Sequence, residues 1–306
     1  MFWEKSYINL LKKSLYKGER KETRKVPTRY LFNESLQIRV KPDEWPLFSL
    51  RKLNPKSPIV EFLWLLSGEE SIEPMIKQGV NFWKPWATEG KDGKRYAESY
   101  GGFWRHLPIQ DDVSSSGLKN GLPHTDTNQP FLAPGKSEYI HFNSKKQPGI
   151  DQLKKIVDNI KTNPYSRRHK LDFWIPQNAL VSNLPPCPCH AVFDVKKEEV
   201  NVLIWQRSVD LPIGAPMNIA VFHLLLQGIA RETNRRPGIL AFNYANAHIY
   251  ENQIYKVEKL LGRSWNQKKA PTIYWPEKSF LDLKPENHDQ FVIKNYNSCA
   301  PLKIQV

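Results

Sequence analysis

Leu184-Pro185-Pro186-Cys187-Pro188-Cys189-His190 is the most informative segment of this sequence. A second segment, Gln206-Arg207-Ser208-Val209-Asp210, follows it downstream and is read together with it. A cysteine thiol attacks carbon only as the thiolate, and a nearby guanidinium is one way to lower the pKa of that thiol. If the fold brings Arg207 close to Cys187, the two side chains form a candidate active site. The remaining sequence must supply the elements that bring them together.

The composition is that of an aromatic-rich globular protein. The chain has 306 residues, of which 40% are apolar, and it contains 10 Trp, 12 Tyr and 14 Phe. Such a chain can bury the core of one large domain or of two small ones. No apolar run reaches the roughly 18 residues of a membrane span, and the first residues lack the apolar core of a signal peptide. With 3 cysteines, two of them separated by one residue, we expect no disulfide framework and a cytoplasmic location.

The charge balance is strongly basic. The sequence has 45 Lys and Arg against 31 Asp and Glu, a formal net charge of +14. Nucleic-acid binding is one interpretation; a solvated basic surface or a site for an anionic phosphate are others. No zinc-finger, RNP-like or glycine-loop motif supports the first, so nucleic acid is not a required partner.

Hydrophobic periodicity predicts a mixture of helices and strands. Leu10, Leu11 and Leu15 share one side of a basic amphipathic helix, and Gly68 closes an apolar one. Residues 196–199 join two alternating segments as a hairpin. The predicted helices are 1–20, 58–66, 150–160 and 217–231, and the predicted strands lie within 29–51 and at 171–174, 191–195 and 200–205.

Residues 106–148 are rich in Pro, Gly, Ser, Asn and Asp and have little periodicity. We interpret them as a surface insertion rather than a domain boundary, because a helical pattern resumes at Ile150. The sequence therefore predicts a single α/β domain over residues 1–306.

Each candidate residue has an ordinary structural explanation when taken alone. Cys187, Cys189 and His190 resemble a metal cluster, but ligands so close along one strand cannot surround a tetrahedral ion, and no second Cys/His cluster completes the set. A redox pair is not expected either, since no thioredoxin-like pattern surrounds the two cysteines. Glu61 fits the solvent-facing side of its helix, and His248 fits a buried histidine whose hydrogen bonds are satisfied.

Taken together, these residues lie in ordered motifs, and the chain resembles the thymidylate synthase family over nearly its whole length apart from 106–148. The resemblance implies a three-layer α/β (α+β) fold with a twisted mixed sheet, and a homodimer paired through that sheet. The motifs are Asn163-Pro164-Tyr165-Ser166-Arg167-Arg168, Leu184-Pro185-Pro186-Cys187, Gln206-Arg207-Ser208-Val209-Asp210, Ile213-Gly214-Ala215-Pro216-Met217-Asn218-Ile219-Ala220 and Ala247-His248-Ile249-Tyr250, with earlier matches at Glu61-Phe62-Leu63-Trp64, Trp83, Trp86 and Tyr100-Gly101.

The spacing of these motifs selects the nucleophile. The family usually has His directly after its cysteine, which would favour Cys189. However, Cys187 lies 19 residues after Arg168, 20 before Arg207 and 31 before Asn218, and these separations match the family without a gap. Cys187 is therefore the predicted nucleophile. We expect Cys189, two residues further on, to share its strand face.

The resemblance implies a specific reaction. The Cys187 thiolate would add to C6 of a pyrimidine nucleotide, and C5 would then attack the one-carbon unit of 5,10-methylenetetrahydrofolate; no metal is implied. The Asn218 carboxamide would accept a hydrogen bond from N3–H and donate one to O4, which favours dUMP over dCMP. Glu61 would move protons around the base, and Arg167 and Arg168 would reach the phosphate of the partner subunit.

The predicted site residues fall into three groups. Those with catalytic roles are Cys187, Glu61, Tyr100, Arg207 and Asn218. Those that bind the nucleotide are Arg24, Arg167, Arg168, Arg207, Ser208, Asn218, His248 and Tyr250. Those that bind the folate are Phe82, Trp83, Trp86, Asp210, Gly214 and Met217.

The last chemical step is left open by the sequence. Hydride on a C5 methylene group gives the methyl group of dTMP, whereas water gives a 5-hydroxymethyl nucleotide. Segments 291–296 and 303–306 resemble the family's closing C-terminal tail and favour dTMP. Departures from the residues usual in the family favour the hydroxymethylase instead, and they occur at Lys84, Pro188, Val192, Met217 and Asn246. An alternative of another class is a relative that binds nucleotide or RNA and has no catalytic activity.

Overall fold

The main sheet is mixed. The computed structural model describes residues 2–23, 26–97, 100, 102–108, 149–176, 179, 182–263 and 269–304. Among these, seven strands form the sheet in the order β1-β2-β11-β9-β8-β7, with β10 beside β11. β11 runs parallel to β9 and β10, and every other neighbouring pair is antiparallel. The strands are β1 (Glu19–Lys21), β2 (Thr28–Ile38), β7 (Lys170–Asp172), β8 (Pro188–Lys196), β9 (Glu199–Gln206), β10 (Val209–Asp210) and β11 (Arg236–Tyr250).

The sheet buries one face and leaves the other open. In β9, Val202 and Ile204 are buried, whereas Leu203 and Trp205 are each 37% exposed. This alternation follows from the two-residue period of a strand whose one face packs on helices. The predicted hairpin is confirmed, since Lys196 pairs with Glu199 at the end of β8 and β9.

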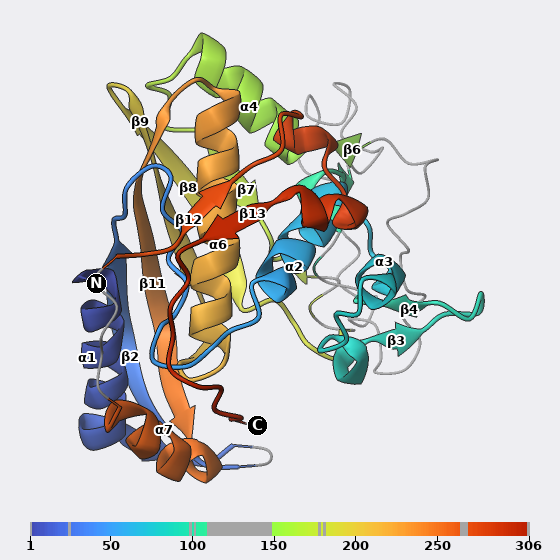
Figure 1. The fold of residues 1–306 in the computed structure, drawn as a ribbon. Helices are drawn as coiled ribbons and strands as arrows, with labels where there is room; N and C mark the ends of the chain where they lie inside the picture. Colours follow the sequence, from blue (N-terminus) through green and yellow to red (C-terminus); the bar gives the residue numbers. More distant parts are fainter. Residues whose placement is uncertain are drawn as a thin grey trace, which may run out of the picture.

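Helices stack on the buried face in two further layers (Figure 1). Helix α6 (Gly214–Glu232) packs on β9 and β11, and α2 (Lys56–Ser67) packs on α6. Helix α6 is apolar along most of its length because it lies between the sheet and α2. Helix α1 (Phe2–Lys17) packs against β2 and buries Leu10, Leu11 and Leu15, as their spacing predicted. The α/β fold with a mixed sheet is confirmed.

Gly68 ends α2 for a steric reason. Its φ is +71°, a left-handed conformation that L side chains rarely adopt, and its N–H donates to the carbonyl of Leu65. A Cβ at this position would lie 2.8 Å from Cβ of Arg105. The predicted helix end is confirmed.

The remaining elements surround these layers. Helix α4 (Gln152–Thr162) begins where the Asp151 carboxylate accepts from the N–H of Lys154, an N-cap that fixes its first turn. The other helices are α3 (Glu73–Lys77), α4 (Gln152–Thr162), α7 (Ile254–Leu261) and the 3-10 turns η1 (Lys84–Trp86), η2 (Gly102–Trp104), η4 (Glu251–Gln253), η5 (Phe280–Asp282) and η6 (Pro285–Gln290). Short strands pair as β3 (Thr88–Glu89) with β4 (Arg95–Tyr96), β5 (Leu107–Pro108) with β6 (Gly149–Ile150), and β12 (Thr272–Tyr274) with β13 (Val292–Lys294).

Most element boundaries differ from the sequence prediction by one to three residues, and some of the differences have a clear form. The first helix ends at Lys17 rather than at residue 20, and the strand within 29–51 ends at Ile38. The strand predicted at 171–174 ends at Asp172, because the next two amides both donate to the carbonyl of Cys189. Of the predicted insertion 106–148, residues 109–148 lie outside the described ranges, so the prediction of a surface insertion in a single domain stays a prediction.

The segment after β13 is held against the core. The hydroxyl of Tyr296 donates to the carbonyl of Phe48 at 2.8 Å, and the N–H of Cys299 donates to the carbonyl of Ser49 at 2.8 Å. Ile304 is buried. The end of the described chain thus lies against the segment that joins β2 to α2.

Candidate functional site

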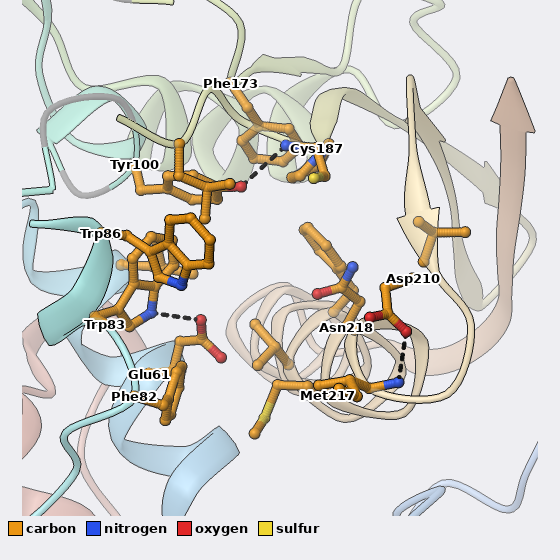
Figure 2. A pocket seen from close by; sticks show the side chains of 18 of the residues that line it. Glu61, Phe82, Trp83, Trp86, Tyr100, Phe173, Cys187, Asp210, Met217 and Asn218 are labelled. Atoms are coloured by element: carbon orange, nitrogen blue, oxygen red, sulfur yellow. Dashed lines mark hydrogen bonds between the residues drawn. The ribbon is translucent and has the colours of Figure 1, made fainter. Parts of the chain in front are cut away.

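A cavity of about 390 Å³ opens between α2, η1, β10 and the first half of α6. Figure 2 shows Trp83, Trp86 and Tyr100 on one side of it, with Asn218 and Asp210 opposite. A concave, mostly apolar site with a few convergent polar groups is the usual form of a small-molecule site. The predicted residues that line it are Glu61, Phe82, Trp83, Trp86, Tyr100, Cys187, Ser208, Asp210, Gly214, Met217 and Asn218.

Glu61 faces this cavity rather than bulk water. Its side chain is on the buried side of α2, and its Oε1 accepts from Nε1 of Trp83 at 2.9 Å (Figure 2). Its Oε2 is buried and has no hydrogen-bond partner among the described residues. Burial raises the pKa of this carboxyl to about 7, and the bond from Trp83 only partly offsets that. The interpretation of Glu61 as a solvent-facing residue is wrong.

Cys187 lies at the opposite end of the cavity from Glu61. Its N–H donates to the hydroxyl of Tyr100 at 2.9 Å, and its carbonyl accepts from the N–H of Arg207 at 3.0 Å (Figure 2). Burial raises the pKa of the thiol, and the Arg207 charge opposes this rise without cancelling it. The thiol is therefore protonated at neutral pH until a reaction partner or base removes its proton.

Cys189 lies apart from the cavity of Cys187, although we expected the two side chains to share one strand face. The pairing of β8 with β9 shifts register between Pro188 and His190, so Cys189 is an extra residue in a β-bulge and the alternation of side chains is broken there. Cys189 lines a separate hollow on the edge of the sheet with His190 and Trp205, whose rings stack at 5.8 Å. The bulge separates the environments of the two cysteines.

Arg207 anchors the loop that carries Cys187. Its Nε donates to the carbonyl of Pro186 at 2.9 Å and its Nη2 to that of Pro185 at 2.8 Å. The guanidinium also lies over the ring of Trp174, 5.4 Å from the centroid. It borders the hollow of Cys189 and not the cavity. Two of its donor groups are thus used to fix the loop, and no described residue is hydrogen-bonded to the other guanidinium donors.

Two glutamines that the sequence analysis missed orient predicted site residues. Gln206 is fully buried and its Oε1 accepts from Nδ2 of Asn218 at 3.4 Å. Nε2 of Gln253 donates to the Asp210 carboxylate at 3.0 Å, and burial nevertheless raises the pKa of Asp210 to about 6. No sequence signal identifies Gln253, whereas Gln206 stands next to Arg207 in a motif already recognised.

The apolar wall of the cavity was also missed. Trp104, Phe173, Val221 and Phe222 line it. The last two could have been found from helical spacing, since they follow Asn218 on α6 by three and four residues and share its face. The first two come from distant segments, and local patterning cannot bring them together.

Several predicted nucleotide-binding residues lie away from this cavity within the described ranges. Arg167 and Arg168 are exposed in the turn after α4. His248 and Tyr250 are neighbours on β11, with rings 5.0 Å apart, and do not line it. Arg24 lies outside the described residues, so its assignment stays a prediction.

The described part of the chain lacks two other functional features. There, no group of three or more His, Cys, Asp or Glu side chains is arranged to hold a metal ion. Within the same ranges, no helix combines the length and apolarity needed to cross a membrane.

Comparison with known proteins agrees with the motifs. The family model for thymidylate synthase matches residues 5–306. The thymidylate synthase of Aster yellows witches'-broom phytoplasma is 32% identical over 303 residues, which cover 97% of this chain and 98% of that protein. That of Phytoplasma mali is 31% identical over 301 residues, with the same coverage of 97% and 98%. That of Mycoplasma pneumoniae is 33% identical over 267 residues, covering 86% and 85%. The chain belongs to the thymidylate synthase family, as its ordered motifs predicted.

Proposed function

We propose that this enzyme methylates dUMP to dTMP, with 5,10-methylenetetrahydrofolate as co-substrate and Cys187 as the nucleophile. The observation that carries the proposal is the convergence of Cys187, Glu61 and Asn218 on one cavity from three separate parts of the chain. A thiol, an unpartnered carboxylate oxygen and an amide are the groups needed to attack a uracil ring, move its protons and read its edge.

Activation of the nucleophile follows from the two perturbed pKa values. Burial keeps the Cys187 thiol protonated, so attack on C6 requires removal of its proton. The Glu61 carboxyl, with its pKa raised to about 7, is both acid and base near neutral pH and can exchange protons through water in the same cavity. Arg207 favours the thiolate once it forms, since its charge opposes the effect of burial.

Recognition of uracil is assigned to Asn218. Its Oδ1 can accept from N3–H, and its Nδ2, oriented by Gln206, retains one N–H for O4. Cytosine reverses both groups, with an acceptor at N3 and a donor at C4. The proposed preference for dUMP over dCMP rests on this polarity.

The residues around the cavity fit a folate. Trp83 and Trp86 offer flat apolar faces for the pterin, and the Asp210 carboxylate, fixed by Gln253, offers an acceptor for its N–H groups. The co-substrate would supply both the one-carbon unit and the hydride that completes the methyl group. The aromatic wall of the cavity favours exclusion of water, and hence methylation over hydroxymethylation.

We also propose that two copies pair through the open face of the sheet, with Arg167 and Arg168 binding the phosphate of the partner's nucleotide. Leu203 and Trp205 expose apolar surface on that face, and both arginines are exposed and free to reach another subunit. In sedimentation the unsubstituted chain is expected to run as a dimer.

A complementation assay tests the trans arrangement. Cys187→Ala and Arg168→Ala chains, each nearly inactive alone, are expected to regain activity when co-expressed, because a hybrid dimer has one site with both residues intact. Cys187→Ala mixed with Asn218→Ala is the matched control and should stay inactive, since both residues belong to the same chain's site. Equal recovery in the two mixtures, or a monomer in sedimentation, would contradict the proposal.

Product analysis tests the reaction itself. With dUMP and 5,10-methylenetetrahydrofolate, we expect a product heavier by a methylene group, together with dihydrofolate, and little turnover of dCMP. A hydroxymethylated product with tetrahydrofolate would assign the enzyme to the alternative reaction. Tight nucleotide binding with neither product would identify a relative without catalytic activity.

A further inference from the structure

Glu4, in the first turn of α1, is a fully buried carboxylate that the proposed reaction does not use. Its Oε1 accepts from the backbone N–H of Ser49 at 2.7 Å and from that of Leu50 at 3.2 Å. Its Oε2 accepts from the hydroxyl of Ser49 at 2.6 Å. A carboxylate is stable away from water only where hydrogen bonds compensate its lost hydration, and these bonds do so. Glu4 therefore fixes one side of the segment 48–50, here called the strap.

The other side of the strap holds the end of the chain. The carbonyl of Phe48 accepts from the hydroxyl of Tyr296 at 2.8 Å. The carbonyl of Ser49 accepts from the N–H of Cys299 at 2.8 Å. Ser49 is thus bonded on both sides, since its N–H and its hydroxyl donate to Glu4 and its carbonyl accepts from the C-terminal segment. The position of that segment therefore depends on the bonds that Glu4 accepts.

Arg51, the residue directly after the strap, connects it to the cavity. Its side chain is buried, and its Nη2 donates to the carbonyl of Pro212 at 2.5 Å. Pro212 lies in the turn between β10 and α6, and Asp210, Ile213 and Gly214 of this region line the cavity. Burial raises the pKa of Asp210 to about 6, and hydrogen bonds and the charge of Arg51 oppose this rise. Arg51 therefore supports both the turn and the charge of a residue beside it.

Tyr7 gives α1 a second, direct contact with the same turn. It follows Glu4 by three residues, so the two side chains share a face of the helix. Its hydroxyl donates to the carbonyl of Leu211 at 2.6 Å, and its side chain is fully buried. The first half of α1 thus reaches the turn along two routes, directly through Tyr7 and indirectly through the strap.

We infer that Glu4 is a positioning residue for the folate side of the site. Its carboxylate fixes the strap, and the strap places Arg51 against the turn beside Asp210. This rests on the proposed function, which puts the folate against that carboxylate. Cys187 stands on a different loop, which Arg207 fixes. Loss of the Glu4 carboxylate therefore impairs use of the folate more than use of the nucleotide.

Glu4→Ala tests this role in the full-length enzyme. It leaves two buried amides and a hydroxyl without their acceptor, so the strap shifts. We expect KM for 5,10-methylenetetrahydrofolate to rise by about tenfold or more, while KM for dUMP changes by less than about threefold. Glu4→Gln keeps an oxygen for both amides and gains an N–H group for the hydroxyl, so it should bring both KM values back to within about threefold of the unsubstituted enzyme. Equal shifts of the two KM values in Glu4→Ala would overturn the inference.

Leu15→Ala is the matched control for a general loosening of α1. Leu15 is buried near the other end of the same helix, so its truncation removes packing but no hydrogen bond to the strap or to the turn. It should lower the midpoint of urea unfolding and leave the ratio of the two KM values unchanged. A ratio that moves as far in Leu15→Ala as in Glu4→Ala would make Glu4 an ordinary core residue.

Hydrogen exchange tests the same claim without substrate or turnover. In the unliganded full-length protein, peptides covering 209–213 and 296–302 should exchange about tenfold faster or more in Glu4→Ala, and at unchanged rates in Leu15→Ala. Unchanged rates in Glu4→Ala would contradict the role of the strap. Failure of the unsubstituted protein to convert dUMP would instead contradict the proposed function, and the exchange rates would still decide what Glu4 holds.

Ser49→Ala keeps the test decisive if Glu4→Ala does not fold. It removes the hydroxyl bond to Glu4 and leaves the backbone bonds in place. Both readouts should then move in the same direction as expected for Glu4→Ala, by a smaller factor. If neither the KM ratio nor the exchange rates move in Ser49→Ala, the inference is wrong.

Discussion

Replacing Cys187 with alanine is expected to lower the rate of dTMP formation by about 10⁴-fold or more, because the covalent step loses its nucleophile and the cavity offers no second thiol. Cys189→Ala, the matched control, removes the same atom two residues away. It should retain activity within about threefold, with a loss of stability of about 1 kcal/mol because Cys189 is buried. Release of dihydrofolate in a steady-state assay measures both variants.

Covalent trapping locates the nucleophile independently of rate. With 5-fluoro-dUMP and 5,10-methylenetetrahydrofolate, the unsubstituted enzyme and Cys189→Ala are expected to form an adduct that survives denaturation, and Cys187→Ala none. A peptide map should then find the added mass on Cys187. An adduct on Cys189 would refute the assignment made from spacing.

Glu61→Gln is expected to reduce kcat by roughly 10²- to 10³-fold while changing KM much less. Gln keeps the shape of Glu61 and its contact with Trp83, but it cannot take or release a proton. In the unsubstituted enzyme, kcat should change with pH around the raised pKa of about 7, and this dependence should disappear in Glu61→Gln. A pH profile unchanged by the substitution would assign the titration to another group.

The same substitution should increase stability. The folded-state pKa of Glu61 is raised from 4.5 to about 7, so the folded protein holds a proton that the unfolded chain releases between these values. The contribution of Glu61 to stability is therefore greatest below pH 4.5 and falls by about 3 kcal/mol as the pH rises to 7. The free energy of unfolding in urea, measured for Glu61→Gln and for the unsubstituted protein, should therefore show a larger advantage for Glu61→Gln at pH 8 than at pH 5. Glu69→Gln, at an exposed position after α2, should show no such gain.

The sequence predicts well what depends on local periodicity and on motif spacing. The hairpin of β8 and β9, the apolar helix α6 and the end of α2 at Gly68 follow from side-chain spacing and backbone freedom. The spacing to distant motifs selects Cys187 over Cys189 as the nucleophile, and of these two cysteines only Cys187 lines the cavity. Spacing is informative here because the separations between motifs are fixed by the lengths of strands and helices.

What the sequence does not predict depends on irregular or long-range geometry. The bulge at Cys189 cannot be predicted from the alternation of side chains along a strand, because a bulge interrupts that alternation. Gln253 reaches Asp210 across 43 positions of the chain, and Phe173 joins the cavity wall from the segment directly after β7. The hydrogen bonds that Glu4 accepts likewise depend on side-chain rotamers that no pattern encodes.

The open face of the sheet has a practical consequence for enzymology. If each working site borrows Arg167 and Arg168 from a second chain through the surface around Trp205, the number of complete sites depends on total protein concentration. Specific activity would then fall on dilution below the dissociation constant of the pair and recover when inactive Cys187→Ala chains are added. Apparent melting temperatures would rise with concentration for the same reason, so rates and stabilities are comparable only at matched concentrations.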